Sequence, residues 1–217
     1  MKTSGLPYTV YINRKLGVII ANATPEFVTP NGLSFFGFLV FIVGLFLLVQ
    51  SSTHVDSILV VIIFLFQYAI DSADGVLARK RKVSSDIGEW LDHSLDGIRI
   101  PLLHIAVLIF FFKSDGYINI VELSAFSLSI IAMSGNYISN ILKVKILSVR
   151  SGSYVEKMVG MRRIGIKLML IPADFGIYYF IFLLLAFDFF VYFYLIWGVY
   201  FLLIFLMNYT LTYMKKL

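Results

Sequence analysis

Long apolar stretches alternate with short polar segments along most of this chain. Six of these stretches have about 20 residues, the length that an α-helix needs to cross a bilayer. They cover approximately residues 33–50, 57–78, 88–112, 121–142, 170–187 and 189–212. The pattern therefore predicts an all-α integral membrane fold with six transmembrane helices.

A different pattern precedes the first apolar stretch. In residues 9–22, Arg14 and Lys15 lie on one helical face, and the opposite face carries Ile12, Leu16, Ile19 and Ile20. This spacing predicts an N-terminal amphipathic helix that lies in the membrane interface. Thr24 and Pro25 then predict the start of another helix, as its cap and first turn. We divide the chain into an N-terminal juxtamembrane amphipathic segment, 1–32, and a six-helix transmembrane catalytic domain, 33–217.

Composition excludes an ordinary soluble domain. Apolar residues make up 59% of the 217 positions and charged residues only 14%. The chain has no cysteine, which excludes disulfides and thiolate metal sites. We expect contact with the lipid bilayer and no nucleic-acid partner.

The basic residues predict how the chain is oriented in the membrane. Residues 79–82 read Arg-Lys-Arg-Lys between the second and third stretches. If this link is cytoplasmic, all basic residues except Lys113 lie on or near the cytoplasmic side. We therefore expect both termini and the active site to be cytoplasmic, in a prokaryotic cell (inner) membrane.

Four aspartates interrupt the second and third apolar stretches at the ends that face each other. Asp71 and Asp74 share one helical face, and Asp92 and Asp96 share another. Carboxylates in membrane helices are costly, so such a group indicates a binding site. Oxygen ligands without His or Cys favour Mg²⁺ or Mn²⁺, and two helices side by side could hold two ions. The alternative is that the aspartates form ion pairs that join the helices, with Arg79, Arg81 or Arg99.

Small residues accompany the carboxylates. Gly75, Ala78 and Gly88 remove side chains from the two faces, which leaves room for a nucleotide or a pyrophosphate. Arg79 can offer a bidentate fork to phosphate oxygens.

The complete pattern resembles the signature of the CDP-alcohol phosphotransferase family. It reads Asp71-x-x-Asp74-Gly75-x-x-Ala78-Arg79, eight residues, Gly88-x-x-x-Asp92-x-x-x-Asp96. Thr29-Pro30-Asn31 before the first span is also similar to members of this family. The resemblance implies a membrane transferase that moves a phosphoryl-alcohol group from a CDP-linked donor to an acceptor hydroxyl and releases CMP.

The resemblance also assigns roles to residues. It implies that Asp71, Asp74 and Asp92 bind the metal ions, and that Asp96 is the general base and can also contact a metal. It implies that CDP and its phosphates are bound by a further group, namely Gly75, Ala78, Arg79, Gly88 and Asn31.

Other polar residues are candidates for binding the acceptor. Asn140 and Lys143 lie in a polar stripe with Asn136, which could instead form hydrogen bonds between helices. Arg150, Arg162 and Arg163 belong to the basic segment 143–169, which could equally attract anionic lipid headgroups. Asp174 is either a further acceptor contact or an ion-pair partner for this segment. His54, His93 and His104 are not expected to be ligands.

We expect phospholipid synthesis from a CDP-diacylglycerol donor. The acceptor is then an alcohol. The many basic residues of segment 143–169 would suit a phosphorylated alcohol. One alternative is a soluble CDP-polyol donor with a polyol phosphate or a lipid as acceptor. An alternative of another class is a divalent-cation carrier, which would place carboxylates near the middle of the bilayer and broken helices in both halves of the chain. The resemblance also implies a homodimer.

Overall fold

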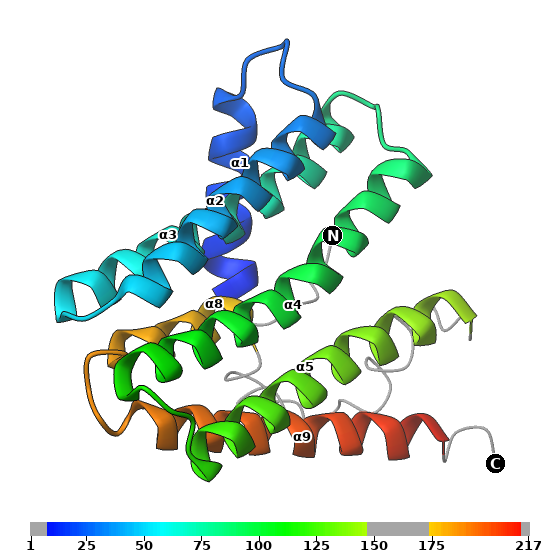
Figure 1. Ribbon diagram of the computed structural model, residues 1–217. Coiled ribbons are helices and arrows are strands. Elements are labelled where there is room, and N and C mark those ends of the chain that lie inside the picture. Colours follow the sequence, from blue (N-terminus) through cyan, green and yellow to red (C-terminus); the bar gives the residue numbers. More distant parts are fainter. Residues whose placement is uncertain (1–7, 147–173, 214–217) are drawn as a thin grey trace.

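The computed structural model describes residues 8–146 and 174–213, and these residues form helices without strands (Figure 1). A short π-helix, η1 (Thr9–Asn13), continues directly into α1 (Arg14–Ala23). The other elements, in chain order, are α2 (Pro30–Gln50), α3 (His54–Lys80), α4 (Asp86–Asp115), α5 (Ile120–Ile146), α8 (Phe175–Tyr178), η3 (Tyr179–Leu184) and α9 (Phe190–Tyr213).

Within residues 8–146 and 174–213, five helices are long and apolar enough to cross a membrane, namely α2, α3, α4, α5 and α9. They confirm the predicted all-α membrane fold. The count of six spans is not confirmed, because the described part of the expected span 170–187 consists of the short helices α8 and η3.

The long helices form a bundle (Figure 1). α2 packs along α3, α4 lies between α2 and α5, and α5 packs along α9. The 3₁₀-helix η3 packs against α3, and its side chains join a core of aromatic residues, among them Phe64 and Phe182. α3 ends and α4 begins at the same end of the bundle, so their polar turns lie near each other.

The ends of these helices follow from local hydrogen bonds. Thr29 caps α2, because its Oγ1 accepts from the amide of Gly32 at 3.0 Å, and Pro30 occupies the first turn. Ser85 caps α4 in the same way, accepting from the amide of Gly88 at 3.1 Å. The Ser85 cap fixes the first residue of α4, and the positions of Asp92 and Asp96 on the helix follow from it.

α1 has a third face that the sequence pattern did not reveal. Gly17 packs on α3, and a Cβ at this position would lie 3.0 Å from the Cβ and the carbonyl carbon of Ser72. Asn13 and Ala21, four residues on either side of Gly17, are also buried. The larger apolar side chains of α1, such as Ile19, remain exposed and are free to contact lipid.

The predicted helix start at Thr24 and Pro25 is wrong. Thr24 ends α1, and a turn follows in which the amide of Val28 donates to the carbonyl of Pro25 at 3.1 Å. The Arg81 guanidinium donates to carbonyls of this turn, including that of Pro25 at 2.9 Å and that of Glu26 at 3.2 Å. Because Arg81 donates to these carbonyls, their hydrogen bonds are formed without a helix in this segment.

Candidate active site

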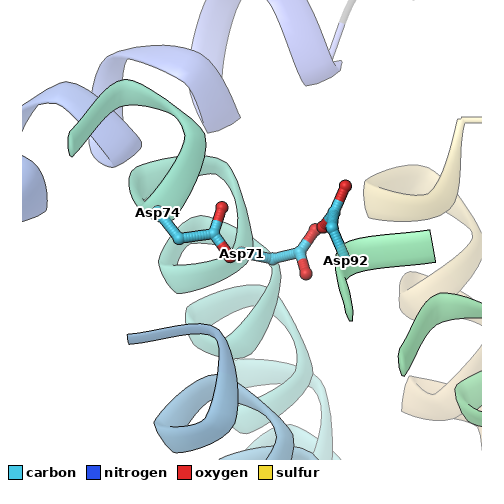
Figure 2. Close-up of side chains that lie close together, drawn as sticks. All are labelled: Asp71, Asp74 and Asp92. Carbon is cyan, nitrogen blue, oxygen red and sulfur yellow. The ribbon is translucent and has the colours of Figure 1, made fainter. Parts of the chain in front are cut away.

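Three carboxylates from two helices converge where α3 ends and α4 begins. Asp71 and Asp74 come from α3, Asp92 comes from α4, and one oxygen of each lies within 4.8 Å of the others. Figure 2 shows Asp71 between the other two, with its carboxylate directed toward Asp92. We call these three residues the acidic cluster. No histidine takes part in a comparable group within the described residues.

The surroundings of the acidic cluster fit a metal ion. Asp74 is buried and accepts a hydrogen bond from the hydroxyl of Ser34 in α2. Among the described residues, no Lys or Arg forms an ion pair with Asp74 or Asp92. Within this part of the chain the two carboxylates have no ion-pair partner, and their oxygen atoms are ligands that hard divalent cations prefer. The acidic cluster could bind such an ion.

Asp96 lies outside the acidic cluster and has a different partner. Its Oδ1 accepts from Nη1 of Arg99 at 2.8 Å, and the same nitrogen donates to Asp71. Arg99 is 6% exposed, so this bridge lies inside the bundle. The ion pairs expected as the alternative to metal binding thus exist for two of the four aspartates. They involve Arg99 and neither Arg79 nor Arg81.

A first hollow adjoins the acidic cluster, with a volume of about 340 Å³. We call it the outer pocket. The structure brings together around it, beside Asp74 and Asp92, all five residues predicted to bind CDP and its phosphates, namely Asn31, Gly75, Ala78, Arg79 and Gly88.

The two glycines of the outer pocket have identifiable neighbours. A Cβ on Gly75 would lie 3.3 Å from Nη1 of Arg79, and a Cβ on Gly88 would lie 3.3 Å from Oδ1 of Asn31. Both contacts are closer than side chains normally allow, so the glycines leave room for Arg79 and Asn31. The resemblance indicated these positions, and the packing of α2, α3 and α4 brings them to one pocket.

A second hollow of about 250 Å³ extends from Asp71 and Asp96 into the bundle. We call it the inner cavity. Its polar wall also includes Arg99 and Gln67, and aromatic and aliphatic side chains form most of the remainder. The four aspartates therefore divide between the two hollows: Asp74 and Asp92 line the outer pocket, and Asp71 and Asp96 line the inner cavity.

Of the residues predicted to bind the acceptor, Asn140, Lys143 and Asp174 fall within the described part of the chain. Asn140 is exposed on α5, and Lys143 lies near the end of that helix. Asn136, from the same predicted stripe, donates to the carbonyl of Phe201 in α9 at 3.3 Å, a contact between helices. The remaining basic candidates, Arg150, Arg162 and Arg163, lie outside the described residues.

Asp174 has partners that sequence reasoning did not foresee. Its carboxylate accepts from the amide and the hydroxyl of Thr9, both at 2.9 Å, and from the amide of Gly176 at 3.1 Å. The Thr9 hydroxyl also lies 2.8 Å from the hydroxyl of Tyr68, which lines the inner cavity. Asp174 thus caps α8 and ties Thr9 to the bundle, and its role in binding the acceptor stays a prediction.

Sequence reasoning missed Ser34 and Gln67 and treated Arg99 only as a possible ion-pair partner. Helical spacing could have indicated two of these residues. Gln67 precedes Asp71 by four residues and Arg99 follows Asp96 by three, so each shares a face with an aspartate. No such signal exists for Ser34, because it reaches Asp74 from another helix.

Comparison with known proteins adds one match. The family model for CDP-alcohol phosphatidyltransferase matches residues 27–207, which include the whole motif and all five candidate membrane spans. A search of curated protein sequences gave no match.

Proposed function

From the premise that this chain belongs to the CDP-alcohol phosphatidyltransferase family, we propose that it transfers a phosphatidyl group from CDP-diacylglycerol to an acceptor alcohol. Membership gives the transferase activity with a CDP-linked donor and an alcohol acceptor. The lipid donor and a role in phospholipid biosynthesis are our proposal. The main support for the proposed transfer reaction is that the acidic cluster adjoins an outer pocket formed by the residues of the motif.

In this proposal Asp71, Asp74 and Asp92 hold two Mg²⁺ ions, for which Mn²⁺ is an alternative. When bound, these ions neutralise charge on the pyrophosphate of the donor. Ser34 keeps Asp74 directed toward the other carboxylates by its hydrogen bond. Bound cations would account for three carboxylates that lie so close together, since without them the like charges repel.

The outer pocket binds the CDP group. Arg79 offers two parallel donors to phosphate oxygens, and its side chain is kept beside the pocket by the absence of a Cβ at Gly75. Gly88 and Ala78 let the nucleotide approach the helices closely, and Asn31 closes the wall formed by the first turn of α2.

Asp96 acts as the general base. The acceptor oxygen forms a bond to the phosphorus that carries the diacylglycerol, and the bond from this phosphorus to the CMP phosphate breaks. The hydroxyl proton passes to the Asp96 carboxylate, and CMP leaves with the electron pair. Arg99 is a positioning residue, because its contact of 2.8 Å holds the carboxylate at the wall of the inner cavity.

The test is CMP release from CDP-diacylglycerol by the purified protein in lipid nanodiscs, with a panel of alcohols. We expect release that requires Mg²⁺ and stops when EDTA is added. Asp96→Asn should lower the rate by about 10²–10⁴-fold, the usual contribution of a general base, and CDP binding should persist. Asp115→Asn is the matched control, because Asp115 is an exposed aspartate at the other end of α4.

Unchanged turnover in Asp96→Asn would remove Asp96 from the mechanism. Activity with a soluble CDP-polyol and none with CDP-diacylglycerol would favour the alternative donor. Failure of every CDP-linked donor in the panel, with Mg²⁺ present, would overturn the proposed reaction.

The orientation and assembly are also part of this proposal. We place both termini and the acidic cluster on the cytoplasmic side of a prokaryotic cell membrane, because nearly all basic residues then lie on that side. We further propose a homodimer, which crosslinking in native membranes would detect.

A further inference from the structure

A third hollow, with a volume of about 590 Å³, lies at the end of the bundle opposite to the acidic cluster. We call it the end pocket. Its wall comes from the last residues of α2 and α4, the first turn of α5, and the link between η3 and α9 (Figure 1). Residues as far apart in the sequence as Val49 and Val191 therefore contribute to one pocket, which the proposed transfer reaction does not use.

Side chains of both charges line the end pocket without pairing with each other. Lys113 lies in the last turn of α4, Glu122 in the first turn of α5, and Asp188 in the link before α9. Among the described residues, no ion pair joins Lys113 to either carboxylate, and its Nζ donates to Gln50. The pocket thus presents separated positive and negative groups, which complement a ligand that carries both charges.

Ser51 is independent evidence for a ligand. It lines the end pocket and is 8% exposed, and its Oγ has no hydrogen-bond partner within the described part of the chain. A buried polar atom without a partner is destabilising, and a polar group of a ligand would remove that cost. Glu122 is 3% exposed, and its Oε2 accepts from the amide of Asn119 at 2.8 Å. This cap accounts for Glu122, but it explains neither the unpartnered hydroxyl nor the separate charge of Lys113.

Size and depth identify the class of ligand. A volume of about 590 Å³ is within the usual range for small-molecule sites and exceeds what a single metal ion needs. Phe111 and Phe190 add non-polar surface to the wall. The end pocket also lies where membrane-spanning helices begin and end, which is the depth of the lipid headgroups. A phospholipid headgroup is a ligand at this depth that can carry both charges.

We propose that the end pocket binds a zwitterionic phospholipid headgroup with a primary ammonium. Lys113 binds the phosphate, and Glu122 and Asp188 bind the ammonium, which also donates to the Ser51 hydroxyl. A primary ammonium has three N–H donors for these groups, whereas a trimethylated ammonium has none. Under the orientation proposed above, this site lies on the outer side of the membrane. Its occupation can be measured without reference to CMP release.

The test is thermal unfolding of the full-length protein in detergent with dihexanoyl-phosphatidylethanolamine, a soluble lipid with a primary ammonium. At ten times its Kd this lipid should raise the Tm by about 3–6 °C. At the same concentration the dihexanoyl lipids with choline and with glycerol headgroups should raise it by less than half as much, because neither offers ammonium N–H donors. Free ethanolamine should leave the Tm unchanged, since it lacks the phosphate that Lys113 binds.

Variants then locate the binding site. Glu122→Gln keeps an acceptor for the amide of Asn119 and removes the charge, so the Kd for the ethanolamine lipid should rise about tenfold or more. Lys113→Gln should raise it similarly. Glu26→Gln is the matched control, because Glu26 is an exposed glutamate in the turn after α1, and it should bind as the parent does. Asp188→Asn, at an exposed position, serves if Glu122→Gln fails to fold.

Equal shifts with all three lipids would overturn the proposal, and so would parental affinity in both Glu122→Gln and Lys113→Gln. A shift with Ca²⁺ alone that Glu122→Gln abolishes would overturn it as well, because the end pocket would then hold a metal ion. None of these results affects the proposed transferase function, which CMP release tests separately.

Discussion

Replacing Arg99 by methionine would leave two carboxylates in the bundle without their shared partner. Arg99 is 6% exposed and contacts both Asp71 and Asp96 through Nη1. Methionine has a similar length and fills the space without charge. The substitution therefore removes the ion pairs and keeps most of the packing.

The cost follows from burial. Arg99 is buried, but Asp71 and Asp96 keep 17% and 35% of their side chains exposed, so the loss of charged hydrogen bonds, about 1.5–3 kcal/mol, sets the scale. For a chain of about 200 residues each kcal/mol lowers the Tm by about 2–4 °C, so Arg99→Met should melt about 3–12 °C below the parent. Mg²⁺ should narrow this difference, since a cation bound at Asp71 replaces part of the lost charge.

Thermal unfolding in detergent, followed by the fluorescence of Trp90 and Trp197, measures the effect. Lys80→Met is the matched control, because Lys80 is exposed and its one bond to a described residue joins it to Asn22 at 2.8 Å, so a change within about 0.5 kcal/mol is expected. The double variant with Asp96→Asn should be more stable than the sum of the two single effects predicts, by about 1 kcal/mol or more. Strict additivity, or a Tm equal to that of the parent, would refute the proposed charge bridge.

Other contacts give further expected outcomes. Gly17→Ala should lower both the Tm and the rate of CMP release, because the added methyl group would lie 3.0 Å from Ser72. Ser72 lies between Asp71 and Asp74 on α3, and a variant with parental Tm and activity would contradict this close packing. Arg81→Ala should raise the KM for the CDP-linked donor, since the turn that it holds leads into the wall of the outer pocket, and an unchanged KM would separate the turn from the site. Thr9→Val should lower the Tm by about 4–8 °C, because its hydroxyl bonds to Asp174 and Tyr68 and each such bond contributes about 1 kcal/mol. An unchanged Tm would show that this attachment does not stabilise the bundle.

Much of the candidate site could be predicted from the sequence because it depends on spacing along single helices. Asp71 and Asp74, three residues apart, must share a face of α3, and Gly75 follows on the same turn. The hydrophobic pattern likewise located all five long helices, because a span in lipid requires a continuous apolar segment that satisfies its own backbone. The expected span 170–187 shows the limit of this reasoning. Its apolar composition does not distinguish a spanning helix from short helices that pack into the bundle. The described part of this segment forms two such short helices, α8 and η3.

Contacts between helices could not be predicted in the same way. The hydroxyl of Ser34 reaches Asp74 from α2, Thr9 reaches Asp174 across most of the chain, and Arg99 joins an aspartate of its own helix to one of α3. Each contact depends on which faces pack together and at what height, and these are decided by side-chain volume and by small residues such as Gly17. The sequence by itself therefore determined the helices and the face that carries each carboxylate. Only the tertiary structure divided the four aspartates between two hollows and placed Arg99 between two of them. The physical reason is that helical periodicity orders residues around the axis of one helix and does not determine where the neighbouring helix lies.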